Sequence, residues 1–401
     1  MKHFISKQTR KSDFELLQTC TRSNINATIW DRLRLLICKV LAQGRFFRSF
    51  GSLAVLIFSI SCTSSKPEPT NYEARKQLLD LIAGEWIAKS IYAATELDIA
   101  TILAKGPMSI HELAIIAECN EEHLYRLLHM LSSNGIFSEN DNCVFSNTEV
   151  SHLLSKEYPF SLHDLVHFYG QEMSQSWNLT TECIKQGRPA FDLTFEMPVF
   201  AYFKSHPEAA QIFNAAMKEK SKMVIDSLLH SYDFGRFRSI CDIGGGCGHF
   251  LSAIFVKYPN MKGILFELSD VIASSDDVLR PFEKRCSRIA GNFFQNIPVQ
   301  ADAYLLKSVL HDWNDQDAIK ILKNCHQAMP DGSSLLIVEP IVSDSNKKEM
   351  AKVMDVYMMI ITGGKERTRQ EFEHLLEKSG FRLDAIISTE TEFSFMIASK
   401  R

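Results

Sequence analysis

The sequence predicts an α/β protein in which a mostly parallel sheet, covered by helices on both faces, follows a helical N-terminal part. Apolar runs of strand length alternate with amphipathic helical segments from residue 236 onward, and a glycine-rich loop joins the first run to a helix. Between residues 71 and 235, apolar residues recur mostly at helical spacing. We therefore expect four parts: an extension (1–70), a helical domain with a small hairpin (71–160), a helical linker and pocket region (161–235) and an α/β domain (236–401).

Composition narrows the classes of function. The 401 residues are 45% hydrophobic with a net charge of −4, which suits a globular protein and argues against a general attraction to nucleic acid. The ten cysteines are scattered, without a CxxC pair or a Cys/His cluster at zinc-ligand spacing. Free thiols in a reducing compartment, the cytoplasm, are the simplest interpretation.

Residues 1–70 differ from the rest. The first fifty carry ten Lys/Arg against three Asp/Glu, and Ser49–Ser65 then holds no charge over 17 residues. A membrane span needs ~20 mostly apolar residues. The basic stretch followed by an apolar one also imitates a signal peptide, but more than forty residues precede it. We expect a poorly ordered or membrane-grazing extension, with contact between residues 46–62 and a membrane as the alternative to a purely cytoplasmic protein.

The region 71–160 resembles a winged helix. Tyr72–Ala104 has helical spacing, and two shorter helices, a glycine stop and a hairpin ending near Ser146 follow. A DNA-binding regulator is the rival interpretation, but the candidate recognition helix Glu121–Met130 begins with two acids and holds one arginine. The apolar face around Trp86 instead favours a structural role in a dimer.

Residues 161–235 are helical, with breaks at three Pro-containing sites, and rich in Met and aromatic residues. Most of these side chains belong to an ordinary core, whereas a minority suits a pocket for a flat aromatic molecule. Together with one residue of a later helix, the candidates are His167, Phe168, Met173, Trp177, Met217 and Met358.

The glycine-rich loop Asp242–Gly248 lies between a buried strand and a helix starting at His249. Closely spaced glycines permit positive φ and let a ligand approach bare backbone beside unpaired helical N–H groups. The next strand ends at Glu267, 19 positions after Gly248, where a carboxylate can accept hydrogen bonds from a ribose. The pattern indicates an adenosine site, and its leading acid resembles the loop of S-adenosylmethionine methyltransferases.

Further strands and helices continue to the C-terminus. Polar residues at or just after the carboxyl ends of strands mark the ligand edge of such a sheet, and they are Asp242, Glu267, Asn292, Lys307, His311 and Glu339. Methyl transfer to oxygen needs in-line alignment and a base, for which His311 is the candidate. Glu339 or the loop residue Glu366 can hold its imidazole in one tautomer.

Five segments in order resemble the small-molecule O-methyltransferase family of caffeate and acetylserotonin enzymes: Asp242–Gly248, Phe266–Leu268, Gly291–Phe294, Leu306–Trp313 and Gly364–Thr368. The resemblance covers Tyr72 to Arg401 and implies a Rossmann-like methyltransferase sheet with an antiparallel last strand, preceded by a winged-helix-like dimerisation domain. It implies a homodimer that methylates a hydroxyl of a small aromatic substrate. It also implies that Gly244, Glu267, Asn292, Phe293 and Lys307 contact S-adenosyl-L-methionine, and that His311 is the base, flanked by Glu339 and Glu366.

Two positions depart from the family pattern, in which aspartate is usual at both Glu267 and Asn292. The amide at Asn292 is a weaker acceptor for the adenine amino group. No Asp/Asp/Asn metal cluster is recognisable, so we expect metal-independent transfer. The remaining alternatives are a nicotinamide-dependent oxidoreductase and a degenerate methyltransferase that acts as a ligand-binding or regulatory protein.

Overall fold

The computed structural model describes residues 70–401. The predictions about the extension, including its signal-like run and the membrane contact of residues 46–62, lie outside the described residues. The chain divides into two units, Met1–Leu79 and Asp80–Arg401. Apart from the first ten residues of α4, the elements below belong to the second unit. Among residues 70–401, each helix is too short or too polar to cross a membrane.

The helical N-terminal domain has the predicted winged-helix arrangement. Its elements are α4 (Thr70–Glu96), α5 (Ile99–Leu103), β1 (Met108–Ser109), α6 (Ile110–Ile116), α7 (Glu121–Ser133), β2 (Phe137–Glu139), β3 (Val144–Asn147) and α8 (Glu149–His152). The three strands form a small antiparallel sheet in the order β1-β3-β2. The first helix ends earlier than predicted, because Asp98 adopts a left-handed conformation with φ 55° before α5.

The first part of α4 is uncovered all round, since residues 71–82 are all exposed. Leu113, Leu128 and Phe145 of this domain are fully buried, yet Trp86 of α4 is 66% exposed and Leu81 and Ile82 beside it are exposed too. An apolar stripe of this kind is typical of a surface that packs against another chain.

Six helices follow, with the three breaks that the sequence predicts and two further ones, at Gln171 and at Trp177–Leu179. They are α9 (His163–Gly170), α10 (Glu172–Ser176), α11 (Thr180–Gln186), α12 (Ala190–Phe195), α13 (Val199–Ser205) and α14 (Pro207–Ser231). Gly187 ends α11 with φ 64°, and Pro207 opens α14 at a position where its missing N–H costs nothing. The long α14 packs against α9 and extends to the α/β domain.

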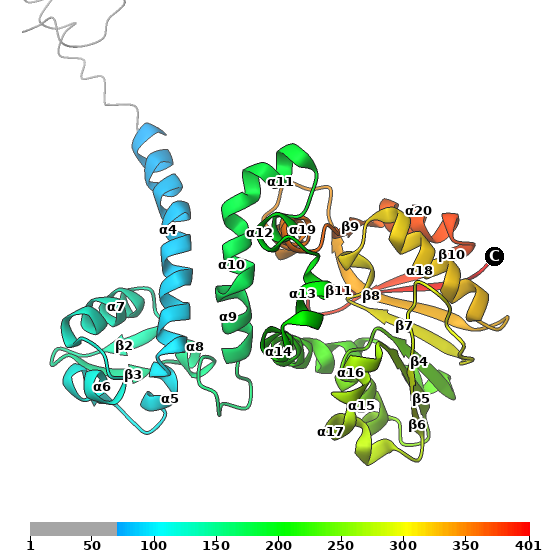
Figure 1. Ribbon diagram of the computed structural model, residues 1–401, viewed down its shortest axis with the longest axis horizontal. Helices are drawn as coiled ribbons and strands as arrows, with labels where there is room; N and C mark the ends of the chain where they lie inside the picture. Colours follow the sequence, from blue (N-terminus) through cyan, green and yellow to red (C-terminus); the bar gives the residue numbers. More distant parts are fainter. Residues whose placement is uncertain (1–69) are drawn as a thin grey trace, which may run out of the picture. The chain divides into compact units, whose positions relative to one another are not determined.

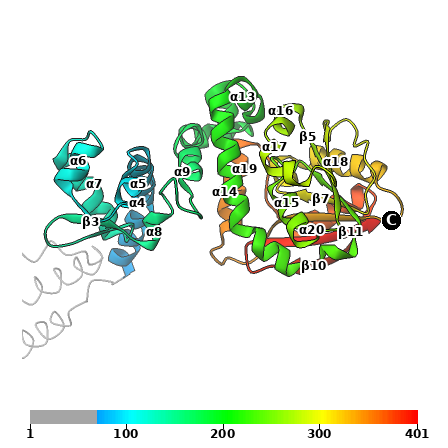
Figure 2. The same ribbon diagram turned by 90° about the horizontal axis from the view of Figure 1, so that it is seen from below.

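The α/β domain is a mostly parallel sheet (Figures 1 and 2). Its strands are β4 (Ser239–Ile243), β5 (Lys262–Glu267), β6 (Cys286–Ala290), β7 (Ala303–Lys307), β8 (Ser334–Val342), β9 (Arg367–Thr368), β10 (Phe381–Ser388) and β11 (Phe393–Lys400). The order is β10-β11-β8-β7-β4-β5-β6, with β9 beside the end of β8. As expected, the last strand β11 runs antiparallel to β8.

Helices cover both faces of this sheet. On one face, α18 (Asp315–Ala328) and α20 (Arg369–Lys378) pack on alternate residues such as Tyr304 and Leu306. On the other, the end of α14 and α15 (His249–Lys257) pack on Leu305 and its neighbours. Successive residues of a strand point to opposite faces of the sheet, and both faces are buried under helices. The strands are therefore apolar at nearly every position.

The order of strands fixes where a ligand can bind. From β4 the chain first adds β5 and β6 on one side and then returns to add β7 and β8 on the other. In open α/β sheets, the crevice at the carboxyl ends of the strands flanking such a reversal is the usual ligand site. Here it lies between β4 and β7, which carry the glycine-rich loop and His311.

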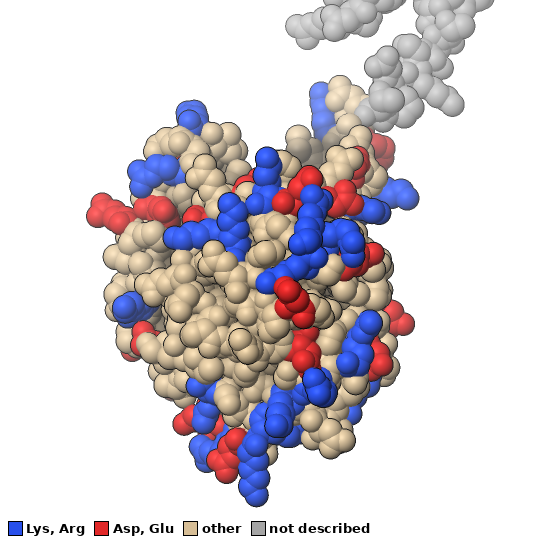
Figure 3. Space-filling model, turned by 90° about the vertical axis from the view of Figure 1, so that its right-hand side faces the viewer, with Lys and Arg blue, Asp and Glu red and all other residues tan. Residues whose placement is uncertain are grey.

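The face of the molecule that Figure 3 shows carries charges of both signs. On the face in Figure 3, Lys and Arg side chains are interspersed with Asp and Glu, and a broad area carries neither. A phosphate-binding surface needs a continuous basic patch, so this face gives no support to nucleic-acid binding.

Candidate active site

The glycine-rich loop depends on its glycines for two reasons. Gly244, Gly246 and Gly248 have φ of 68°, 57° and 81°, which L side chains rarely adopt. At Gly245, a Cβ atom would lie 2.3 Å from Oδ2 of Asp242. The loop therefore closes tightly over the Asp242 carboxylate and leaves its backbone exposed to a ligand.

Two acids flank this loop. Asp242 is buried, its Oδ2 has no hydrogen-bond partner among residues 70–401, and burial raises its pKa to about 7 although Lys307 opposes the shift. Glu267, at the end of β5, accepts hydrogen bonds from the N–H of Gly246 at 3.1 Å and of Leu268 at 2.7 Å. Burial raises the pKa of Glu267 despite these two bonds. Its carboxylate is thereby held at the rim of the loop.

The loops after β6 and β7 form the opposite wall. Asn292 Oδ1 accepts a hydrogen bond from the N–H of Phe294 at 2.8 Å, so this oxygen is engaged by its own turn. The Phe293 ring lies beside Gly244 and 6.1 Å from the Trp313 ring. At the end of β7, Lys307 Nζ lies 3.4 Å from Ser221 Oγ of α14, and burial lowers its pKa to about 8.

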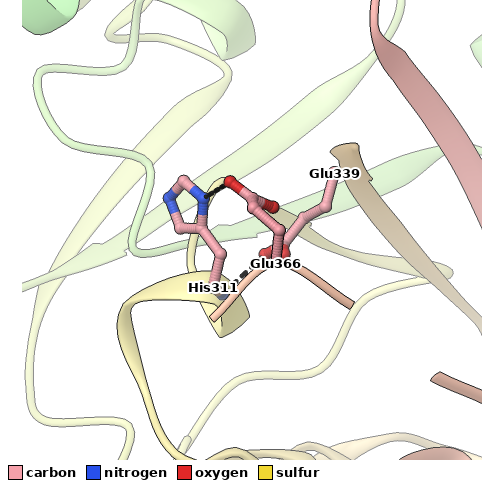
Figure 4. A group of neighbouring side chains, drawn as sticks. All are labelled: His311, Glu339 and Glu366. Carbon is pink, nitrogen blue, oxygen red and sulfur yellow. Dashed lines mark hydrogen bonds and ion pairs between the residues drawn. The ribbon is translucent and has the colours of Figure 1, made fainter. Parts of the chain in front are cut away.

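His311 and Glu366 form a buried pair (Figure 4). His311 lies in a short 3-10 turn after β7, and its Nδ1 is 2.9 Å from Oε1 of Glu366, which precedes β9. Its Nε2 lies 3.8 Å from Oδ1 of Asp312. Burial disfavours the charged imidazole, but attraction by Asp312, Glu366 and Glu339 outweighs it and raises the pKa of His311 to about 9.

Glu339 acts on the backbone rather than on the ring. Its Oε1 accepts hydrogen bonds from three successive amides, those of Val309, Leu310 and His311, at 3.0, 2.6 and 3.3 Å. It makes no hydrogen bond to the imidazole among the described residues. Of the two acids proposed to hold the ring, Glu366 makes that contact, whereas Glu339 fixes the turn that carries His311.

These residues surround a cavity of about 380 Å³. It is lined by every residue expected to contact the cofactor, namely Gly244, Glu267, Asn292, Phe293 and Lys307, and by His311. Glu339 and Glu366 lie behind His311 and do not line it. The walls on the other side come from α9, α13, α14 and α19 (Met350–Ile361).

Three of the six residues expected in the substrate pocket line this cavity. They are Phe168, Met217 and Met358. His167 does not, because its Nδ1 pairs with Glu96 at 2.7 Å. Met173 is buried in the core between the helices, and Trp177 is 41% exposed. Helical spacing alone does not tell which face of a short helix points inward.

Other lining residues were not singled out from the sequence. Phe200 stacks on Trp313 with centroids 5.7 Å apart, and Tyr357 of α19 presents a hydroxyl without a partner among the described residues. From α14 come Lys220 and Ser221. Their spacing from Phe213 and Met217, on one side of a helix, is the signal that points to them.

Taken together, the fold and site define a Rossmann-like methyltransferase. The unpartnered Asp242 oxygen, the bare glycine loop and the rim acid Glu267 suit a ligand with an amino acid group and a ribose. The buried His311–Glu366 pair lies at the same edge.

The chain belongs to the O-methyltransferase family. The model of the O-methyltransferase domain matches residues 177–382, and that of the O-methyltransferase dimerisation domain matches residues 79–157. The protein is thus an S-adenosylmethionine-dependent methyltransferase of the O-methyltransferase type, as the five segments had indicated.

Three relatives illustrate the similarity. A phenazine O-methyltransferase of Lysobacter antibioticus is 35% identical over 323 residues, covering 80% of this chain and 95% of the relative. A phenazine-1-carboxylate N-methyltransferase of Pseudomonas aeruginosa is 29% identical and covers 82% and 99%. The solved structure of a mitomycin 7-O-methyltransferase is 29% identical, with a TM-score of 0.78 over 83% of this chain and 99% of that one.

Proposed function

We propose that this protein transfers the methyl group of S-adenosylmethionine to a hydroxyl of a small aromatic molecule, with His311 as the general base and without a metal ion. The observation that carries the proposal is the 2.9 Å contact between His311 Nδ1 and Glu366 Oε1. An ionised carboxylate only accepts, so Nδ1 is the donor, and a neutral ring then carries its lone pair on Nε2. That nitrogen is the atom that takes the proton of the acceptor.

The pKa of about 9 requires that something favour the neutral ring in the loaded enzyme. The cofactor supplies an activated methyl group on a cationic sulfonium. A positive charge in the same cavity disfavours the imidazolium and lowers the pKa of His311. The acids around the ring then stabilise the charge that His311 gains as it takes the proton.

The cofactor residues act through separate contacts. Glu267 accepts from the ribose hydroxyls, and Asp242 accepts from the methionyl amino group through its unpartnered oxygen. Gly244 would let the cofactor approach the backbone, and the Phe293 ring would pack on the cofactor. Asn292 Oδ1 already accepts from the N–H of Phe294, so Asn292 would offer the cofactor the remaining lone pair of this oxygen and its amide N–H₂.

Metal-free transfer is supported by how the candidate ligand atoms are engaged. His311, Glu339 and Glu366 each have a ligand atom within 4.8 Å of the others. However, Glu339 Oε1 already accepts three backbone N–H groups, and Nδ1 of His311 is bonded to Glu366. A cation at Oε1 of Glu339 and Nδ1 of His311 would have to replace these bonds, which also hold the turn after β7; Oε2 of both glutamates has no hydrogen-bond partner among residues 70–401.

We further propose a homodimer in the cytoplasm. The exposed stripe of α4 that includes Leu81, Ile82 and Trp86 lies in or beside the matched dimerisation domain and supports the homodimer. The scattered cysteines support a reducing compartment.

A methyl-transfer screen tests the function. The protein is incubated with methyl-labelled S-adenosylmethionine and a panel of phenols and aromatic amines, and the products are analysed by mass. O-methylated products that disappear with His311→Ala support the proposal. Tight binding of S-adenosylhomocysteine without transfer to any acceptor supports a ligand-binding or regulatory protein instead, and transfer to nitrogen alone would reassign the acceptor atom.

A further inference from the structure

The cavity has a cation that the methyl-transfer proposal leaves without a role, Lys220 of α14. It lines the cavity and is partly buried, yet its Nζ makes no hydrogen bond and no ion pair with any residue of 70–401. Two other lysines line the cavity: Lys218 of the same helix, which is exposed, and Lys307 of β7, which belongs to the expected cofactor contacts. Burying part of a lysine without a partner is unfavourable, so the position of Lys220 is best explained by an anion that enters with a ligand.

The position of Lys220 along α14 relates it to the aromatic end of the cavity. Residues 213, 217 and 220 are spaced four and three apart and form one row on the helix, whereas Asn214, Lys218 and Ser221 form the adjacent row. In the first row, the Phe213 ring stacks on Phe203 with centroids 4.7 Å apart. Lys220 therefore continues the row that offers flat apolar surface.

The surrounding charges place Lys220 near the base. Burial raises the pKa of Asp312, the neighbour of His311, and the positive charges of His311 and Lys220 oppose that rise. Burial, and after it the charge of Lys220, lower the pKa of Lys307 to about 8. By contrast, the charge of Lys218 acts on Cys247 and His249 beside the glycine loop. The charge of Lys220 is thus felt at Asp312 beside His311 and at Lys307 at the end of β7, whereas that of Lys218 is felt beside the glycine loop.

We propose that the acceptor carries a carboxylate besides its hydroxyl, and that Lys220 binds this carboxylate and orients the hydroxyl toward His311. The proposal rests on the methyl-transfer function given above and specifies its substrate class as hydroxylated aromatic acids. Asp312 cannot be the intended partner, because its Oδ1 faces Nε2 of His311 at 3.8 Å and no ion pair with Lys220 forms. A carboxylate on a flat ring would satisfy Lys220 while the ring packs along Phe213 and Met217.

The methionyl group of the cofactor also carries a carboxylate that Lys220 could bind. The test therefore separates a carboxylate on the acceptor from the carboxylate of the cofactor. Acceptors are used in pairs that differ only in charge, such as hydroxynaphthoates against the matching naphthols and hydroxynaphthamides. For each pair, kcat and KM are measured in the unaltered protein, in Lys220→Met and in Lys220→Glu. The affinity for S-adenosylhomocysteine is measured in each by calorimetry. Lys222→Met, on an exposed position of the same helix that does not line the cavity, is the control.

We expect KM for the acids to rise roughly 10- to 100-fold in Lys220→Met, because a hydrogen bond to a charged group is worth about 1.5–3 kcal/mol. The naphthols and the affinity for S-adenosylhomocysteine should be unchanged, and Lys220→Glu should be worse still for the acids. A loss of S-adenosylhomocysteine affinity in Lys220→Met, with no change in the preference for acids, would assign the lysine to the cofactor and overturn the proposal. Equal use of acids and naphthols by the unaltered protein would also overturn it, while the methyl-transfer function would stand.

A binding measurement keeps the proposal testable if no acceptor in the panel turns over. The complex with S-adenosylhomocysteine is titrated with 1-naphthoate and 2-naphthoate, which lack a hydroxyl, and with the corresponding naphthamides. Binding of a naphthoate that is weakened in Lys220→Met and kept in Lys222→Met supports the anion site independently of catalysis. If the naphthoates bind no better than the amides, or bind equally well to both variants, the site does not exist.

Discussion

Replacing Glu366 by Gln provides the sharpest test of the site, because it removes one charge and changes the hydrogen bond to His311 while keeping the shape. The carboxylate is 1% exposed and its Oε1 lies 2.9 Å from Nδ1. A glutamine at this position fits the same space. Its amide group can donate to Nδ1, which would move the ring proton to Nε2, the nitrogen that has to accept the proton of the substrate.

Two effects follow, and they differ in kind. A nearby carboxylate typically shifts the pKa of a partner by 1–3 units, so its loss should lower the pKa of His311 from about 9 toward ~6–8. Without the cofactor, the neutral fraction of the ring at pH 7.5 would rise from about 3% at a pKa of about 9 to about half at a pKa of ~7.5. The acid limb of the rate profile, which reports the protonated and inactive ring, should therefore move to lower pH. The plateau at high pH should nevertheless fall, by ~10²–10⁴, because the favoured tautomer is the wrong one.

The assay is kcat/KM for the acceptor at saturating S-adenosylmethionine, measured between pH 5.5 and 10 in both proteins. Because the cofactor is saturating, its sulfonium charge is present in both proteins at every pH. The difference between the acid limbs of the two pH profiles therefore reports the effect of Glu366 alone. Glu373→Gln is the matched control, since Glu373 is exposed and pairs with Arg369 on the same C-terminal part of the chain. An acid limb that stays in place or moves to higher pH in Glu366→Gln would refute the assignment of His311 as the base.

Other changes should separate binding, stability and assembly. His311→Ala should lower turnover by ~10²–10⁴ and leave the calorimetric affinity for S-adenosylhomocysteine nearly unchanged. Gly245→Ala should cost about 1–3 kcal/mol of unfolding free energy and weaken cofactor binding, because its Cβ would lie 2.3 Å from Asp242 Oδ2; denaturant titration and calorimetry measure the two. A saturating ligand at 100 times its Kd stabilises a protein by ~2.7 kcal/mol, so S-adenosylhomocysteine should raise the Tm clearly, and Glu267→Ala should reduce that rise. Trp86→Glu should shift the protein from dimer to monomer in sedimentation, since the side chain is 66% exposed on an apolar stripe.

The sequence was sufficient for the sheet because its signals are local. The alternation of apolar runs and helices, and the glycines that need positive φ, depend only on neighbouring residues. The carboxyl ends of parallel strands meet at one edge, which is why Asn292 and Lys307 could be placed with Glu267 before any coordinates. Order along the chain was enough here because the topology of such sheets is strongly restricted.

The substrate wall was harder to predict because it depends on how short helices rotate. His167 and Phe168 are adjacent in α9, yet only Phe168 lines the cavity, and His167 turns toward Glu96. A five-residue helix such as α10, which carries Met173, has too few residues for its spacing to define a buried face. Lys220 was missed for a related reason, since a lysine on a helix is most often solvated, and only its row with Phe213 and Met217 points inward.

The division of work between the two buried glutamates could not be inferred from their positions in the sequence. Both were assigned to the imidazole because both follow the active edge of the sheet. Glu339, however, lies in β8 directly beside the end of β7, where the strand gives way to a turn and leaves consecutive N–H groups unpaired. A carboxylate that accepts three of them removes the cost of burying those donors. The ring can then be left to Glu366, which reaches it from a loop preceding β9, so that His311 is fixed through its backbone by one acid and through its side chain by the other.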